Sequence, residues 1–452
     1  GTVAEKTAYG FVMKYFADKS EKTGHPIVKR RCEIERISEG CTDIRRTTGQ
    51  HPGGIVVLPI GEEIHSFTPV QHPANDMKTS ITTTHFDYHS IDHNLLKLDI
   101  LGHLDPTMIR MLQDLTGLDP LEIPLDSKEV MSLFQNTSAL GITPQDIGGC
   151  KLGALGIPEF GTDFVIQMLL DTKPQSFSDL IRISGLSHGT DVWLGNAQTL
   201  IEEGNATIST AICTRDDIMI YLINKGLDSE ESFTIMESVR KGKGLKPQWE
   251  EEMKKHEVPD WYIWSCKKIK YMFPKAHAAA YVMMAYRIAY YKIFYPLAYY
   301  AAYFSIRASA FSYELMCLGQ ERLEYYMHDY ERRKDTLSKK EQDTYKDMKI
   351  VQEMYARGFT FAPVDLYTAQ AHRFQIVDGK LMPALDTIEG LGDKAADAVV
   401  LAARDGAFLS KDDFRNRTKV SKTVIDLMDD LGVFGDIPES NQISLFDFAK
   451  SS

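Results

Sequence analysis

The sequence has few cysteines and no closely spaced cysteine pair. Its 452 residues include six cysteines, none of them in a C-x-x-C pair. Neither a disulfide framework nor a zinc site with the usual cysteine spacing is indicated, and this usage fits a protein of the reducing cytoplasm.

Uninterrupted apolar runs of membrane-spanning length are also lacking. The most apolar region, residues 276–304, is interrupted by Arg287, Lys292 and Pro296. A membrane span needs about 20 predominantly apolar residues, so we expect no membrane partner.

Positive charge is in deficit, because 51 Lys and Arg face 63 Asp and Glu and give a formal net charge of −12. Taken whole, this charge argues against nonspecific attraction to nucleic acid. Phosphate contacts need only local cations, however, and basic residues cluster at 29–31, 45–46, 240–246 and 267–275. Each cluster taken alone is also compatible with a solvated helix face.

One carboxylate stands out in residues 94–102, where Asp99 lies near the end of a short apolar run. The run predicts a buried strand, and a buried strand rarely contains Asp unless the charge is paired, hydrogen-bonded or bound to metal. A carboxylate at a strand end before Gly102 is well placed for a hard cation such as Mg²⁺. Spacing alone leaves a solvated strand-end Asp equally open.

Four motifs in the same order resemble one protein family. They are Leu-Asp-Ile-Leu-Gly at 98–102, Arg-Thr-Thr-Gly-Gln-His-Pro-Gly-Gly-Ile at 46–55, Ser-His-Gly-Thr-Asp-Val-Trp-Leu-Gly at 187–195 and Pro-Lys-Ala-His-Ala-Ala-Ala-Tyr at 274–281. The sequence resembles the bacterial replicative DNA polymerase III alpha subunit, in particular the PolC type of Gram-positive bacteria. The resemblance is collinear across essentially the whole chain.

The resemblance implies that Asp99 is the third of three catalytic aspartates and a metal ligand. The other two would lie in an upstream Asp-x-Asp motif, and Gly1 to Tyr9 resembles the segment shortly after that motif. We therefore expect the C-terminal part of a longer polypeptide, with a two-Mg²⁺ site completed by residues absent from this chain. Such a chain would be inactive alone.

The expected fold is multidomain α+β. Residues 1–45 are predicted to be a helical late thumb, and 46–105 the returning, strand-containing half of a partial mixed palm. Residues 106–358 are predicted to be mostly helical fingers, and 359–436 a duplex-DNA-binding helix-hairpin-helix domain. Residues 437–452 would be a flexible tail.

Cations and aromatic residues of the predicted fingers are candidates for contact with the incoming nucleotide. By resemblance these are Arg215, Arg240, Lys241, Lys243, Tyr271, Lys275, His277 and Tyr281. Their individual roles are not assigned, and His277, in an Ala-rich helix, would without the motif be read as a core residue. Glycines 53 and 54 allow close backbone approach to a ligand, which suggests that Gln50 and His51 lie beside the primer terminus. The alternative is that this segment is only a structural entry into a strand.

The segment 388–396, Ile-Glu-Gly-Leu-Gly-Asp-Lys-Ala-Ala, resembles a helix-hairpin-helix. Gly390 and Gly392 allow a tight turn whose backbone N–H groups face a DNA phosphate, and Lys394 adds positive charge there. Strand-like alternation at 361–365 and 373–377 precedes it. Residues 421–435 predict a helix with a glycine stop.

The tail contains Gln442, Leu445 and Phe446 in a Gln-x-x-Leu-Phe pattern. It resembles the pentapeptide by which bacterial polymerases bind the sliding clamp, a short peptide with apolar anchors. The alternative is that both apolar side chains fold back onto the last domain.

The sequence thus predicts part of a DNA-directed DNA polymerase. Its partners would be primer–template DNA, deoxynucleoside triphosphates, the sliding clamp and other replisome subunits. The main alternative is a noncatalytic DNA- and clamp-binding module. A metal-dependent phosphohydrolase would explain Asp99 but neither the hairpin nor the tail.

Overall fold

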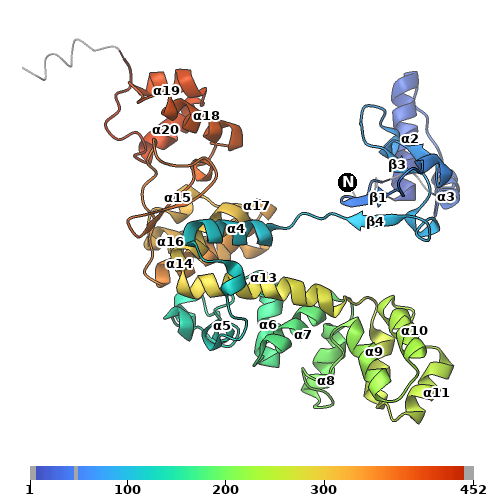
Figure 1. Ribbon diagram of the computed structural model, residues 1–452. Helices are drawn as coiled ribbons and strands as arrows, with labels where there is room; N and C mark the ends of the chain where they lie inside the picture. The colour runs from blue at the N-terminus through green and yellow to red at the C-terminus, as the bar shows by residue number, and fades with distance from the viewer. Residues whose placement is uncertain (1–6, 45–48, 442–452) are drawn as a thin grey trace, which may run out of the picture. The chain divides into compact units, whose positions relative to one another are not determined.

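The computed structural model describes residues 7–44 and 49–441. The chain divides into two compact units, Gly1–Gly102 and His103–Ser452 (Figure 1). No helix in the described ranges is long and apolar enough to cross a membrane.

The first unit begins with two helices, α2 (Ala8–Thr23) and α3 (Arg31–Gly40). The Thr7 side chain accepts a hydrogen bond from the Gly10 N–H and caps the start of α2, which ends at Gly24 with a φ of 66°. A side-chain oxygen at the start and a left-handed glycine at the end are strong helix boundaries. The predicted helical character of this segment is confirmed.

Two small antiparallel sheets complete the first unit. Strand β1 (Gly54–Val57) pairs with β4 (Leu96–Asp99), and Gly54 lies opposite Asp99. Strand β2 (Val70–Gln71) pairs with β3 (Thr83–Thr84). The β1–β4 pairing therefore brings the glycine-rich turn next to Asp99, although 40 or so residues separate them in sequence.

The prediction that the run ending at Asp99 is a buried strand is wrong. Leu96 and Leu98 are 61% and 46% exposed, and Ile55 and Val57 of β1 are exposed as well. A two-stranded sheet buries its apolar side chains only where another layer packs on it. The apolar run correctly predicts a strand, but it does not predict whether the strand is buried.

The second unit is mostly helical, and its centre is the helix α13 (Lys275–Phe294). Its residues Ala278, Val282, Ala285 and Ala289, spaced four, three and four apart, are all buried. That spacing puts them on one helix face, and their small size lets neighbouring helices approach closely. Helix α13 contacts α4 (Leu104–Thr116), α5 (Lys128–Ser132), α7 (Phe177–His188) and α14 (Pro296–Ala302) (Figure 1).

The unit contains twelve further α-helices in its described residues. They are α6 (Asp163–Thr172), α8 (Gln198–Glu202), α9 (Arg215–Asn224), α10 (Ser229–Arg240), α11 (Pro247–Lys255), α12 (Asp260–Lys268), α15 (Tyr313–Met316), α16 (Gln320–Arg332), α17 (Lys339–Ala356), α18 (Asp393–Arg404), α19 (Lys411–Thr418) and α20 (Lys422–Asp430).

A second hydrophobic core organises the C-terminal part. Strands β5 (Gln375–Val377) and β6 (Lys380–Met382) form a hairpin whose turn residues, Asp378 and Gly379, both have positive φ. This is the two-residue turn that matches strand twist. The predicted strand at 361–365 is wrong: Pro363 removes a backbone donor, and only Phe361 forms a bridge, to Leu381.

An ion pair lies fully buried between α13 and α17. The Lys292 Nζ is 2.9 Å from Glu353 Oε1, and both side chains are 0% exposed. Lys292 also donates to the carbonyls of Gly153 and Leu155, at 2.7 and 2.6 Å. Tyr300 of α14 donates to Glu353 at 2.6 Å. Burial lowers the pKa of Lys292.

Removing one partner of this pair is expected to destabilise the second unit strongly. Lys292→Met leaves the Glu353 carboxylate and two carbonyls buried without their donor, which should cost about 3–5 kcal/mol in unfolding free energy. Chemical denaturation measures it. Lys339→Met, which removes an exposed pair with Asp343, is the control and should cost less than about 1 kcal/mol. Equal losses for the two variants would contradict the prediction.

Candidate functional site

Asp99 and His51 lie together at the end of the β1–β4 sheet. The His51 Nε2 is 3.8 Å from Asp99 Oδ1, and the Lys97 Nζ is 3.4 Å from the same oxygen. The Gly53 N–H donates to His51 Nδ1 at 3.2 Å, so the other ring nitrogen is left to carry the proton that faces Asp99. Gln50, the other predicted primer-proximal residue, is exposed.

The two glycines of this turn, Gly53 and Gly54, leave space for neighbouring atoms of the same chain. A Cβ at Gly53 would lie 2.6 Å from the Ile100 carbonyl oxygen, and one at Gly54 would lie 2.7 Å from His51 Nδ1. The close backbone approach that the sequence suggested is therefore to β4 and His51. The glycines hold the histidine beside the carboxylate.

Asp99 offers a single carboxylate to a cation. Its side chain is 48% exposed, which leaves room for further ligands. Within the described ranges it belongs to no group of three or more metal-type ligands. Asp99 thus fits one ligand position of a Mg²⁺ site, and the remaining oxygen ligands have to come from elsewhere.

In the second unit, three of the predicted cations surround one carboxylate that the sequence reading missed. Glu237 lies 2.5 Å from Arg240 Nε, 3.0 Å from Lys241 Nζ and 3.8 Å from Arg215 Nη1. Hydrogen bonds from Arg240 above all, and then from Lys241, lower the pKa of Glu237 to about 2. The Lys243 ammonium makes no ion pair with a described residue.

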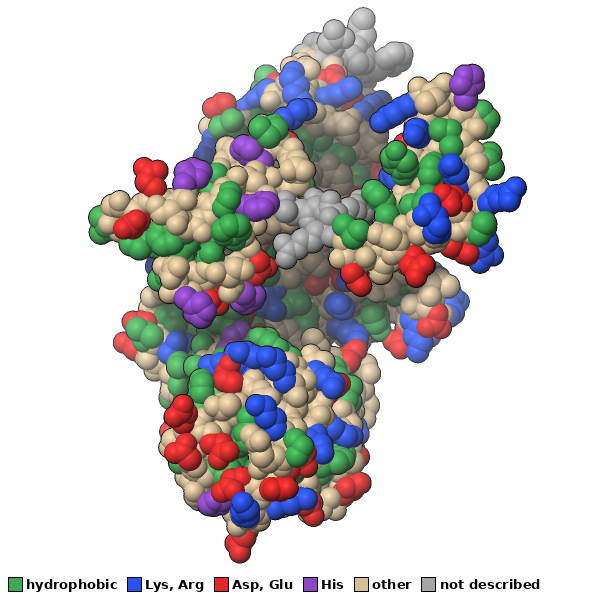
Figure 2. Space-filling model, turned by 90° about the vertical axis from the view of Figure 1, so that its right-hand side faces the viewer, with side chains coloured by type: hydrophobic (Ala, Val, Ile, Leu, Met, Phe, Trp, Pro, Cys, Tyr) green, Lys and Arg blue, Asp and Glu red, His purple; other side chains and the backbone are tan. Residues whose placement is uncertain are grey.

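The N-termini of α9 and α13 meet beside these cations. The Arg215 N–H donates to the Phe273 carbonyl at 3.2 Å, and the Lys275 N–H donates to Asp216 at 2.6 Å. Helix N-termini carry partial positive charge and favour anions. On the face drawn in Figure 2, Lys and Arg are interspersed with Asp and Glu.

The predicted aromatic residues form a row along the start of α13. Ring centroids are 5.1 Å apart for Tyr271 and Phe273, 4.9 Å for Phe273 and His277, and 4.5 Å for His277 and Tyr281. The Tyr281 hydroxyl lies 2.9 Å from His103 Nε2. The structure thus brings Tyr271, His277 and Tyr281 together.

A partly buried ion pair between His188 and Glu159 packs against this row of rings, because the His188 ring contacts Phe273 and His277. The His188 Nε2 is 2.7 Å from Glu159 Oε2, and its Nδ1 donates to the Ser184 carbonyl at 2.7 Å. The hydrogen bond to Glu159 raises the pKa of His188. Burial, and then the charge of His188, lower the pKa of His277. The pKa values of the two neighbouring histidines are thereby shifted in opposite directions.

Glu159 and Phe273 were not predicted. Phe273 lies next to a singled-out motif, and Glu159 has a φ of 69° that no sequence pattern reveals. His188 lies within the 187–195 motif, whose residues 187–193 are predicted from the sequence to line the nucleotide pocket.

The helix-hairpin-helix turn precedes α18. Gly390 has a φ of 82°, and Gly392 is the N-cap of α18. Lys394 is exposed in the first turn of that helix. The backbone conformation that the two glycines predicted is present. Gln442, Leu445 and Phe446 lie outside the described residues.

Three family descriptions match the chain. Residues 6–102 match the bacterial DNA polymerase III alpha NTPase domain, 105–258 the bacterial DNA polymerase III alpha subunit finger domain, and 358–443 a helix-hairpin-helix motif. Similarity to whole proteins is also high. A PolC-type DNA polymerase III of Clostridium perfringens is 55% identical over 446 residues, and so is that of Bacillus subtilis. The chain belongs to the PolC-type DNA polymerase III family.

The resemblance drawn from four motifs is therefore confirmed. The match covers 99% of this chain but only 30% of those two relatives, and 31% of a PolC-type relative from Caldanaerobacter subterraneus that is 53% identical. The chain thus spans about a third of the length of these PolC-type proteins. Its position within the longer proteins stays a prediction.

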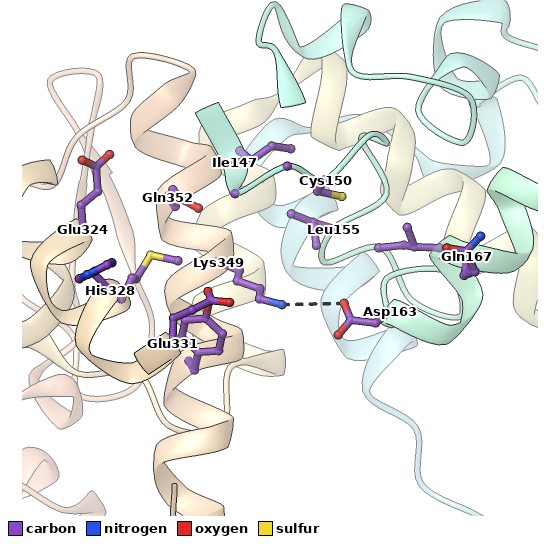
Figure 3. Close-up of a pocket in the computed structure, with 15 residues that line it drawn as sticks. Ile147, Cys150, Leu155, Asp163, Gln167, Glu324, His328, Glu331, Lys349 and Gln352 are labelled. Atoms are coloured by element: carbon purple, nitrogen blue, oxygen red, sulfur yellow. Dashed lines mark hydrogen bonds and ion pairs between the residues drawn. The ribbon is translucent and has the colours of Figure 1, made fainter. Parts of the chain in front are cut away.

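A cavity of about 650 Å³ lies elsewhere in this PolC-type chain, between α16, α17 and the start of α6 (Figure 3). Figure 3 shows Lys349 pointing toward Asp163, at 3.8 Å, with Glu331 and Glu324 on the facing side. Three carboxylates against one lysine disfavour a phosphate ligand. The predicted nucleotide residues are not among those that line this cavity.

Changing Glu159 to Gln is expected to lower the pKa of His188, because the neutral amide no longer stabilises the imidazolium. The raised pKa means that this pair stabilises the folded chain fully below the ordinary pKa of about 6.5, and that the contribution is lost as pH rises through the raised value. NMR titration of the His188 ring measures the shift. Glu202→Gln, on an exposed part of α8, is the control. An unchanged His188 pKa in Glu159→Gln would show that the pair does not form.

Proposed function

We propose that the chain is part of a replicative DNA polymerase that adds deoxynucleotides to a primer 3′ end. The observation that carries the proposal is identity above 50% to PolC-type DNA polymerase III over 99% of the chain. The residues support it, since one unit places a carboxylate at a strand end and the other collects cations at two helix N-termini.

Asp99 is the residue we assign to the reaction centre. Bound Mg²⁺ would activate the primer hydroxyl and neutralise charge on the triphosphate. Asp99 would contribute one oxygen ligand and His51, whose Nε2–H faces that carboxylate, would hold it in place. The Lys97 ammonium, 3.4 Å from Asp99, places a countercharge beside the carboxylate.

The second unit would bind the triphosphate and the base. Arg215, Arg240, Lys241 and Lys275 converge near the N-termini of α9 and α13, and Lys243 follows on the same segment. Charge-assisted hydrogen bonds to phosphate suit this group. Tyr271, His277 and Tyr281 offer ring faces for stacking. Neutral His277 would stack without adding charge.

The C-terminal part would bind duplex DNA through the hairpin at Gly390 and Gly392, whose backbone N–H groups and the α18 N-terminus suit a phosphate. Lys394 would add a cation. Such contacts carry no sequence information, as a replicative enzyme requires. Together with the other replisome subunits, this polymerase would act in the cytoplasm.

Replacing Asp99 by Asn in the full-length protein is expected to abolish primer extension and leave primer–template affinity near normal. The amide is a weaker metal ligand, and Asp99 makes no part of the hairpin contact. Steady-state incorporation and fluorescence anisotropy measure the two properties. Asp92→Asn, on an exposed turn of the same unit, is the control. Retained turnover in Asp99→Asn would remove Asp99 from the metal site and favour the noncatalytic DNA- and clamp-binding module.

The tail is proposed to bind the sliding clamp through Gln442, Leu445 and Phe446. Support comes from the sequence pattern and from the family alone. Leu445→Ala with Phe446→Ala should lower affinity for the clamp by a few kcal/mol, because two apolar anchors are lost. Calorimetric titration against the purified clamp measures it, with hairpin-dependent DNA binding as the unchanged control. Equal affinities would show that these side chains belong to the domain core.

A further inference from the structure

In the C-terminal part, one histidine and three carboxylates lie close together near the helix-hairpin-helix turn at Gly390 and Gly392. His372 precedes β5, Asp386 lies in the 3-10 turn Leu385–Thr387, and Asp393 opens α18. One ligand-type atom from each of these three lies within 4.8 Å of the other two, which makes them the only such metal-type trio that the described residues contain.

The imidazole of His372 is held between two carboxylates. Its Nδ1 is 2.9 Å from Asp386 Oδ2, and its Nε2 is 2.9 Å from Asp397 Oδ1. A neutral imidazole has one N–H, and if Nε2 donates to Asp397, the Nδ1 lone pair faces a carboxylate oxygen. That arrangement repels unless a cation lies between the two atoms.

A second proton on the ring would satisfy Asp386, but Asp393 adds a third ligand atom that a ring proton does not reach. An imidazole nitrogen and two carboxylate oxygens from three separate segments form a ligand set suited to divalent metals of the first transition row. Asp397 holds the outer ring nitrogen as carboxylates do around metal-bound histidines. His372 and Asp393 are exposed, so water has access to further coordination positions.

We propose that His372, Asp386 and Asp393 bind a divalent transition-metal ion, with Asp397 as the positioning residue. The site is independent of Asp99 and of the polymerase reaction. It would tie the loop before β5 and the 3-10 turn to the first helical turn of the hairpin motif.

The test is binding of Mn²⁺, followed by its electron paramagnetic resonance signal, and of Zn²⁺, followed by calorimetry, to the untagged chain near neutral pH. One site is expected. His372→Ala and Asp386→Asn should each weaken it at least tenfold, and Asp397→Asn by roughly 10–100-fold. Circular dichroism checks that each variant is folded. If His372→Ala is not folded, His372→Gln takes its place.

Two controls separate this site from other metal binding. Asp92→Asn should keep it, since Asp92 lies in the other unit, and His89→Ala, at a histidine that is 90% exposed, should keep it as well. Binding of neither ion in stoichiometric amount would overturn the proposal, and so would affinity in His372→Ala equal to that of the unchanged chain. If zinc were bound by cysteines instead, the affinity of His372→Ala would equal that of the unchanged chain.

Discussion

The buried contact between Lys292 and Glu353 constrains the part of the molecule that we assign to the nucleotide. It joins α13, α17 and the carbonyls at 153–155, and neither charge has access to water. Two buried charges are tolerated only when each finds its partners, so the three segments have one permitted arrangement. Helix α13 is a rod of 20 residues, about 30 Å long. Fixing its C-terminal half therefore fixes His277 and Tyr281 near its start.

Near the N-terminus of α13, Glu237 forms ion pairs with three cations, Arg215, Arg240 and Lys241. A single carboxylate beside Arg215, Arg240 and Lys241 orders three flexible side chains and still leaves net positive charge. Because Glu237 has a pKa of about 2, it stays ionised throughout the neutral range. Glu159 is likewise paired, with His188, and the charge of His188 adds to burial in lowering the pKa of His277. In a chain of net charge −12, the proposed nucleotide site would depend on this local excess of three cations over the one carboxylate they share.

What the sequence could predict depended on local patterns. The helix α13, the hairpin glycines and the strand ending at Asp99 follow from spacing, from positive φ and from apolar runs. Glu159 and the partner of Lys292 do not, because each acts through a contact between segments far apart in sequence or through a backbone conformation unusual for its residue type. Glu237 is three and four residues from Arg240 and Lys241, a helical spacing that the sequence does contain, and only its contact with Arg215 joins distant segments. The exposure of Leu96 and Leu98 was missed for a related reason: a run of apolar residues reports strand propensity, whereas burial depends on what packs on the sheet.

At the helix-hairpin-helix turn, the backbone and the side chains would have opposite effects on phosphate binding. Asp393 and Asp397 lie within the first turns of α18, and Asp386 lies just before the turn, so side-chain charge near the hairpin is more negative than Lys394 alone would suggest. The proposed contact with DNA would therefore depend on the backbone N–H groups at Gly390 and Gly392 and on the N-terminus of α18. His372 already offsets two of these carboxylates by bridging them. Whatever cation neutralises this cluster, proton or metal ion, also removes a repulsion that an approaching phosphate would meet.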